Sequence, residues 1–176
     1  MSCDEIMAYL NKYLPEDIAI ISITEASERF HSRYNATGKT YSYTCYCGAS
    51  KPVFNRKYVY VLEKEPDIVA MKKAADILIG EHDFASFCGN PKMKKSTVRE
   101  VDTIDIRYKN GYINMTFHGN GFLQHMVRII VGTLLEVGFN KRSIDSVKEL
   151  LVIKERSKAG FTAPAKGLCL EKVDYN

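Results

Sequence analysis

The longest apolar pattern in the chain runs from Gly121 to Gly138. Within it, apolar side chains recur at i, i+3, i+4 and i+7, which is the spacing of one wide apolar face on an α-helix. Gly138 follows the last of them, at a place where a left-handed C-cap is common. We predict that this segment is the central helix of the core. The apolar positions are Leu123, Met126, Val127, Ile130, Val131, Leu134 and Leu135.

Arg128 interrupts this stripe between Val127 and Ile129. Its guanidinium cannot lose its proton, so burial at this position demands an anionic partner. Two interpretations stay open on the pattern alone. Arg128 lies at the edge of the stripe and extends its charged head to water, or it points at a carboxylate or phosphate in a functional site.

Two segments alternate as β-strands do. Residues 98–108 and 112–117 flank Asn110-Gly111, a dipeptide that favours a type I′ hairpin turn. Residues 39–47 alternate strictly and place Tyr41, Tyr43, Cys45 and Cys47 on one face.

Weaker patterns complete the prediction. Strands are expected over residues 18–23, 57–62 and 168–173, and shorter helices over 4–13, 66–78 and 144–152. Asp4, Pro66 and Ser143 open those helices. Residues 81–87 read as turns, and residues 154–166 read as a polar segment extended over the surface. These elements indicate an α+β fold, a mainly antiparallel sheet with helices packed on one face, in a single domain over residues 1–176.

The composition limits the classes of function that the chain can have. The chain has 176 residues and a net charge of +4, a mild basic excess that permits a nucleic-acid partner. Five scattered cysteines without a CxxC pair favour reduced thiols in the cytoplasm. The four histidines lack metal-site spacing, so no metal is expected. No apolar run reaches the length of about 18 residues that spans a membrane, and the first residues lack a signal-peptide pattern.

Three groups of residues are candidates for chemistry. Tyr41 and Tyr43 are sheet-core aromatics or a platform on which an RNA base stacks. The cations after Gly89 form a solvated loop or follow a phosphate backbone; they are Lys92, Lys94, Lys95 and Arg99. His118 and His125 bracket the start of the central helix, and we expect both to line one cleft with Arg128.

Read in order, several segments resemble the C-terminal half of bacterial tRNA pseudouridine synthase A, over nearly the whole chain. The block from His125 to Arg128 is the most specific. The matching segments are Leu14-Pro-Glu-Asp-Ile18, Phe30-His-Ser-Arg-Tyr-Asn-Ala36, Lys39-Thr-Tyr-Ser-Tyr43, Gly80-Glu-His-Asp-Phe-Ala-Ser-Phe87, Thr97-Val-Arg99, Gly121-Phe-Leu-Gln-His-Met-Val-Arg-Ile-Ile-Val-Gly132 and Gly167-Leu168.

The resemblance implies an isomerase that converts uridine to pseudouridine in the anticodon arm of tRNA, as a homodimer and without an organic cofactor. Tyr41 matches the tyrosine that stacks on the uracil, and Arg128 matches the arginine that pairs with a catalytic aspartate. We also predict RNA-binding positions at His31, Arg33 and His125, together with the cations after Gly89.

One departure from the family is large. The family's aspartate lies in an Arg-Thr-Asp-Ala-Gly-Val-His type segment of the N-terminal half, and no such segment occurs here. We therefore expect this chain to be the C-terminal half of such an enzyme, truncated and inactive alone. The alternatives are an RNA-binding module without catalysis and a dimerisation module.

Overall fold

The computed structural model describes residues 1–90 and 92–175. It divides into two compact units, Met1–Asn35 and Ala36–Asn176. That residues 1–176 form a single domain stays a prediction. In the described residues, no helix is long and apolar enough to cross a membrane.

The first unit contains one helix, α1 (Cys3–Tyr13). Its cap is Ser2 rather than Asp4, because Ser2 and Glu5 form a reciprocal capping box, with N–H···O distances of 2.7 and 3.2 Å. The strand predicted over residues 18–23 is wrong. The Asn11 side-chain amide bonds both the N–H and the carbonyl of Ile20, at 2.7 and 2.8 Å, so this stretch has an alternative to a sheet ladder.

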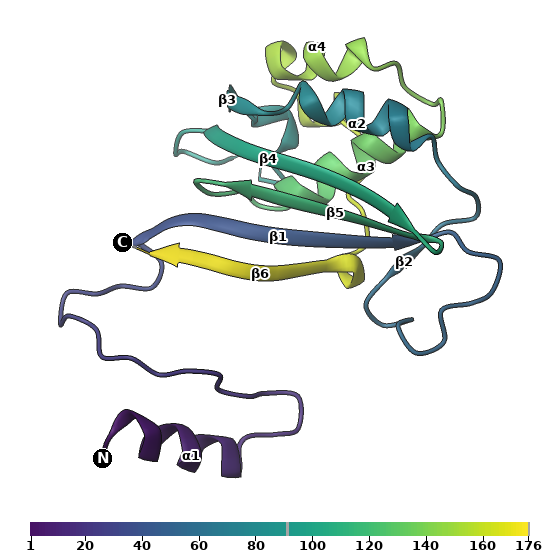
Figure 1. Cartoon of the computed structure of the whole chain (residues 1–176). Helices are drawn as coiled ribbons and strands as arrows, with labels where there is room; N and C mark the ends of the chain where they lie inside the picture. Colours follow the sequence, from purple (N-terminus) through teal and green to yellow (C-terminus); the bar gives the residue numbers. More distant parts are fainter. Residues whose placement is uncertain (91, 176) are drawn as a thin grey trace. The chain divides into compact units, whose positions relative to one another are not determined.

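The second unit is built on a six-stranded sheet of order β2-β1-β5-β4-β3, with β6 also paired to β1 (Figure 1). All pairs are antiparallel except β1 with β2. The predicted fold class is confirmed. The strands are β1 (Ala36–Tyr46), β2 (Tyr60–Val61), β3 (Gly80–Asp83), β4 (Val98–Lys109), β5 (Tyr112–Gly119) and β6 (Leu168–Tyr175).

The predicted hairpin is confirmed as β4 and β5. Asn110 and Gly111 have φ angles of 53° and 80°, both positive as a type I′ turn requires. Two other strands differ from prediction. Only Tyr60–Val61 of the segment 57–62 pairs, and residues 80–83 form β3 along β4 instead of a turn.

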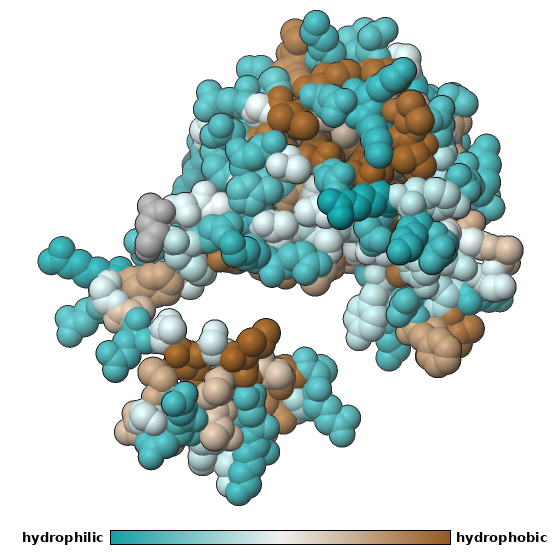
Figure 2. Space-filling model, viewed as in Figure 1, coloured by the Kyte–Doolittle hydropathy of each residue, from teal (hydrophilic) through white to brown (hydrophobic). Residues whose placement is uncertain are grey.

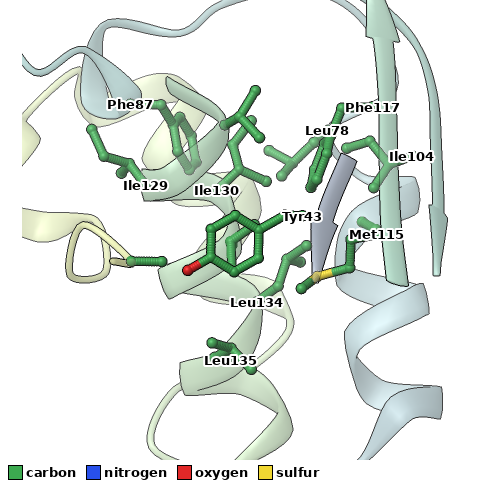
Figure 3. Packing of buried hydrophobic residues seen from close by; sticks show 14 of the residues in the cluster. Tyr43, Leu78, Phe87, Ile104, Met115, Phe117, Ile129, Ile130, Leu134 and Leu135 are labelled. Atoms are coloured by element: carbon green, nitrogen blue, oxygen red, sulfur yellow. The ribbon is translucent and has the colours of Figure 1, made fainter. Parts of the chain in front are cut away.

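Helices α2 (Ile68–Asp76), α3 (Met126–Gly138) and α4 (Asp145–Ile153) lie on one side of the sheet (Figure 1). Figure 2 shows hydrophobic surface over this helical layer. Val69 of α2 and Val152 of α4 are exposed. Inside, α3 packs on the alternating residues of the strands, and the Tyr43 ring lies beside Ile130 and Leu134 (Figure 3).

The central helix differs from prediction at both ends. It begins at Met126, and the chain from Gly121 to His125 is non-helical. It includes Gly138, and the left-handed residue is Asn140, with φ 56°. A Cβ on Gly138 would lie 2.8 Å from Pro66 and 2.9 Å from Met71, so this glycine allows α2 and its preceding loop to approach the helix.

Candidate active site

A pocket of about 160 Å³ opens beside the N-terminus of α3. Four separate segments form its wall: β1, the turn before α3 with the first turn of α3, the short helix η3 (Ala165–Gly167), and the start of β6. The wall is mostly apolar and aromatic, with one guanidinium. Its residues are Tyr41, Phe122, Leu123, His125, Met126, Val127, Arg128, Ala165 and Leu168.

Tyr41 reaches this pocket because β1 alternates. Tyr43 and Cys45, on the same face, are fully buried under α3, whereas Tyr41 is only partly buried nearer the start of the strand. The Tyr41 ring meets Phe122 edge to face, with centroids 5.4 Å apart. Within residues 1–90 and 92–175, no group forms a hydrogen bond with the Tyr41 hydroxyl. The pocket therefore presents an aromatic wall with an available hydroxyl.

Arg128 lines the same pocket and is half-buried. Its Nε donates to the Ala163 carbonyl at 2.6 Å, and Nη1 lies 3.4 Å from Nδ1 of His125. No carboxylate in the described parts of the chain forms a salt bridge with it. By contrast Glu136, the only other residue of α3 that is not buried, pairs with Arg142 at 2.9 Å. In the described residues, the acidic residue of α3 therefore has a cationic partner, whereas its arginine has no acidic partner.

The end of the helix adds to the positive potential. Arg128 lies in the first turn of α3, where the helix dipole disfavours a cation and favours an anion. His125, just before the helix, has a left-handed backbone with φ 60°, which costs a non-glycine residue of the order of 1 kcal/mol. Its ring lies against Gly89, where a Cβ would come within 2.7 Å. The positive potential at this end of the helix therefore favours an anionic group in the pocket.

The crossing segment, residues 159–165, holds Arg128 in place. It passes directly over α3 at Gly132, where a Cβ would lie 1.8 Å from the Phe161 carbonyl oxygen. The N–H of Gly160 donates to the Thr133 hydroxyl at 3.0 Å. Residues 154–166 were predicted to lie extended over the surface, and this is wrong for the crossing segment, since Gly160 and Ala163 are buried.

Below the pocket, buried polar groups are kept neutral. The Tyr43 hydroxyl donates to the Pro164 carbonyl at 2.7 Å, and burial raises its pKa above the ordinary value. Burial also raises the pKa of the Cys45 thiol, to about 12. Both groups therefore stay protonated well above neutral pH.

The predicted cationic loop lies next to this turn. The N–H of Gly89 donates to the Gln124 carbonyl at 2.8 Å, and Arg99 is the group nearest to Gly121. The lysines between them are exposed; they are Lys92, Lys94 and Lys95. The two ends of this loop, Gly89 and Arg99, therefore lie beside the turn before α3.

The prediction that His118 shares this cleft is wrong. His118 lies on the opposite face of β5 from Phe117, which points into the core. Its Nδ1 is 2.6 Å from an Asp102 oxygen, and its Nε2 is 3.4 Å from Asp174. Strand alternation was the available signal, because a residue next to a core phenylalanine must face away from the core.

His31 and Arg33 belong to the unit Met1–Asn35 and form a local turn there. Nδ1 of His31 accepts from the N–H of Arg33 at 3.1 Å, and the His31 N–H donates to the Asn35 side chain at 2.7 Å. Both residues are exposed. Phe122, Ala163, Ala165 and Leu168 were not predicted as site residues, because nothing local in the sequence brings them to Tyr41.

Known proteins resemble this chain over almost its full length. A family model described as tRNA pseudouridine synthase matches residues 74–176. The tRNA pseudouridine synthase A of Clostridium kluyveri is 46% identical over 170 residues, which cover 97% of this chain and 70% of that protein. The protein of that name from Lysinibacillus sphaericus is 43% identical over 173 residues, covering 98% and 70%. A tRNA pseudouridine synthase A 2 of Bacillus cereus is 40% identical over 171 residues, covering 97% and 70%. The chain belongs to the tRNA pseudouridine synthase family.

Proposed function

We propose that this chain forms part of an enzyme that isomerises uridine to pseudouridine in the anticodon arm of tRNA. The bond from the ribose to a uracil nitrogen is replaced by a bond to a uracil carbon. A proton leaves that carbon and one is gained at the nitrogen, so the reaction needs no oxidant and no organic cofactor. Family membership supports the reaction, and the pocket supports the substrate, because its aromatic wall fits an unstacked base.

One observation carries the proposal: Arg128 lines the pocket beside Tyr41 without a carboxylate partner in the described residues. In the described residues this guanidinium contacts one backbone carbonyl and the His125 ring, and it can still pair with a carboxylate. In our proposal Tyr41 stacks on the uracil, and Arg128 orients a catalytic aspartate that lies outside these 176 residues.

The cations around the pocket would hold the tRNA backbone. Lys92, Lys94, Lys95 and Arg99 form one such group, and His125 contacts the nucleotide near the start of α3. We also assign RNA contacts to His31 and Arg33. Five free thiols support a reducing compartment, and we propose a homodimer in the cytoplasm.

The test is reconstitution. A polypeptide of these 176 residues is assayed for pseudouridine in a tRNA transcript, alone and with the N-terminal part of the Clostridium kluyveri relative. We expect no product alone and product from the mixture. Tyr41→Phe keeps the ring, and Tyr41→Ala removes it. We expect the alanine variant of the mixture to bind the target uridine less well.

Turnover by the 176 residues alone would contradict the need for an external aspartate. Salt-dependent tRNA binding without product from any mixture would favour the module without catalysis.

A further inference from the structure

The loop between β1 and β2 carries exposed aromatic rings among positive charges. We call residues 48–59 the aromatic–basic loop. Phe54 is 95% exposed and Tyr58 is 71% exposed. Lys51, Arg56 and Lys57 are exposed too, and no acidic residue occurs from position 48 to position 62. In Figure 2 hydrophobic atoms gather at the tip of the part that projects at the lower right, where Figure 1 shows this loop.

The fold holds this loop in a defined shape. Pro52 and Val59 are buried, which fixes both sides of the tip. The Asn55 side chain donates to the Tyr112 hydroxyl at 3.2 Å, and Arg56 donates to the Val53 carbonyl at 2.7 Å. The two rings are therefore exposed on an anchored loop, at the cost of leaving apolar surface in water.

The loop is attached to the same edge of β1 as the pocket. In the strand register, Leu168 of β6 pairs with Tyr43, and Tyr60 of β2 pairs with Cys45. Tyr41, which lines the pocket, is four residues before Cys45, or roughly 13 Å along the strand. The loop itself packs against Tyr46 and Tyr112, whose side chains lie on the sheet face opposite Tyr41. A ligand that meets both the pocket and the loop therefore has to pass around this edge of β1.

We propose that the aromatic–basic loop is a second RNA-binding surface, which holds an unpaired stretch of the RNA whose target base enters the pocket. Bases stack on Phe54 and Tyr58, and Lys51 and Lys57 contact the phosphates. The positive charge selects RNA over an apolar protein partner. This inference rests on the proposed action on tRNA, but its test concerns binding and not catalysis.

The chain has no tryptophan, so Phe54→Trp creates a single fluorescent reporter at the loop. We expect single-stranded oligouridylate and a tRNA transcript to quench this reporter, because a base stacks on the indole. The matched control is Val152→Trp on α4, at a residue that is 76% exposed, and it should not be quenched.

Affinity measurements on the full chain separate stacking from simple apolar contact. Phe54→Ile keeps apolar surface but loses the ring, and we expect at least about fivefold weaker tRNA binding, as about 1 kcal/mol of lost stacking gives. Lys51→Glu with Lys57→Glu should weaken binding more at low salt than at high salt.

Unchanged affinity for Phe54→Ile, or equal quenching of both tryptophan variants, would overturn the inference. Self-association that depends on Phe54, with no effect of Phe54→Ile on RNA affinity, would do the same and would identify a contact between copies. If Phe54→Trp is quenched but no reconstituted mixture makes pseudouridine, the loop stands as an RNA surface and the proposed catalysis fails.

Discussion

Arg128 and Ala163 hold each other through two hydrogen bonds. The Arg128 Nε donates to the Ala163 carbonyl at 2.6 Å, and the Ala163 N–H donates to the Arg128 carbonyl at 3.0 Å. The two residues are 35 positions apart in sequence. Because one bond fixes the backbone and the other fixes the side chain, the guanidinium is oriented before any acid reaches it, which limits the entropy lost on pairing.

Arg128→Met tests whether this arginine serves function or stability. We expect the free energy of unfolding to change by about 1 kcal/mol or less, because the lost hydrogen bond is offset by removing a cation from the helix N-terminus. Pseudouridine formation by the reconstituted mixture should fall by about three orders of magnitude. Urea denaturation and product analysis measure the two effects. A loss of about 3 kcal/mol with activity intact would show that Arg128 is a structural residue.

Gly132→Ala tests the close approach of the crossing segment. A methyl group would overlap the Phe161 carbonyl, which is backbone and cannot rotate away. We expect a loss of about 2 kcal/mol in the free energy of unfolding. Activity of the reconstituted mixture should fall as well, because Ala163 moves away from Arg128. Gly121→Ala is the control. Among the described residues, a Cβ there would have only Arg99 within 4 Å, at 3.9 Å, so this variant should keep wild-type stability. Equal stability of both variants would mean that the segment does not pack as described.

Lys95→Glu with Arg99→Glu tests the cationic loop. We expect weaker tRNA binding across RNA sequences and a shallower dependence of affinity on salt, because fewer counterions are released. Titrations at two salt concentrations measure this. Lys72→Glu with Lys148→Glu makes the same change in net charge on two helices and should have a smaller effect. If both double variants weaken binding equally, the cationic loop contributes only through the net charge of the protein and not through specific contacts.

The lowered pKa of Asp83 predicts that the free energy of unfolding falls in acid. Burial alone would raise its pKa, but hydrogen bonds from Lys154, Thr97 and the Ala85 N–H outweigh burial and lower the pKa below the ordinary 3.8. A lowered folded pKa means that the stabilisation is complete well above pH 3.8 and is lost as the pH falls through the folded value. We expect Asp83→Asn to cost about 1–2 kcal/mol at pH 7 and progressively less below pH 4, measured by urea denaturation. A difference that is constant with pH would exclude the carboxylate as its cause.

The raised pKa of Cys45 predicts that the free energy of unfolding falls at alkaline pH. Its folded pKa of about 12 exceeds the ordinary 9.0, so its stabilisation is complete below pH 9 and is lost as the pH rises toward 12. The native thiol should therefore resist iodoacetamide at pH 9, whereas the exposed Cys169 should react quickly. Mass spectrometry of the labelled peptides measures both rates. Similar rates at the two cysteines would show that β1 opens readily.

The features that the sequence predicted well depend on near neighbours. The β4–β5 hairpin follows from Asn110-Gly111, because the turn type is decided by two residues. The face of β1 that carries Tyr41 and Tyr43 follows from alternation, and the buried stripe of α3 follows from helical spacing. Arg128 was a candidate because a charged side chain within an apolar stripe must either reach water or pair with an anion.

Contacts between distant segments needed the tertiary structure. Whether residues 18–23 or 80–83 pair depends on which partner lies beside them, so one predicted strand is absent and one unpredicted strand exists. Gly132 lets the crossing segment pass over α3. No sequence pattern within residues 159–165 predicts that contact. The sequence by itself determined which residues could serve the site, through periodicity and residue chemistry. Tertiary packing alone decided that Tyr41 and Arg128 share one pocket and that His118 faces away, because those relations depend on how strands and helices stack.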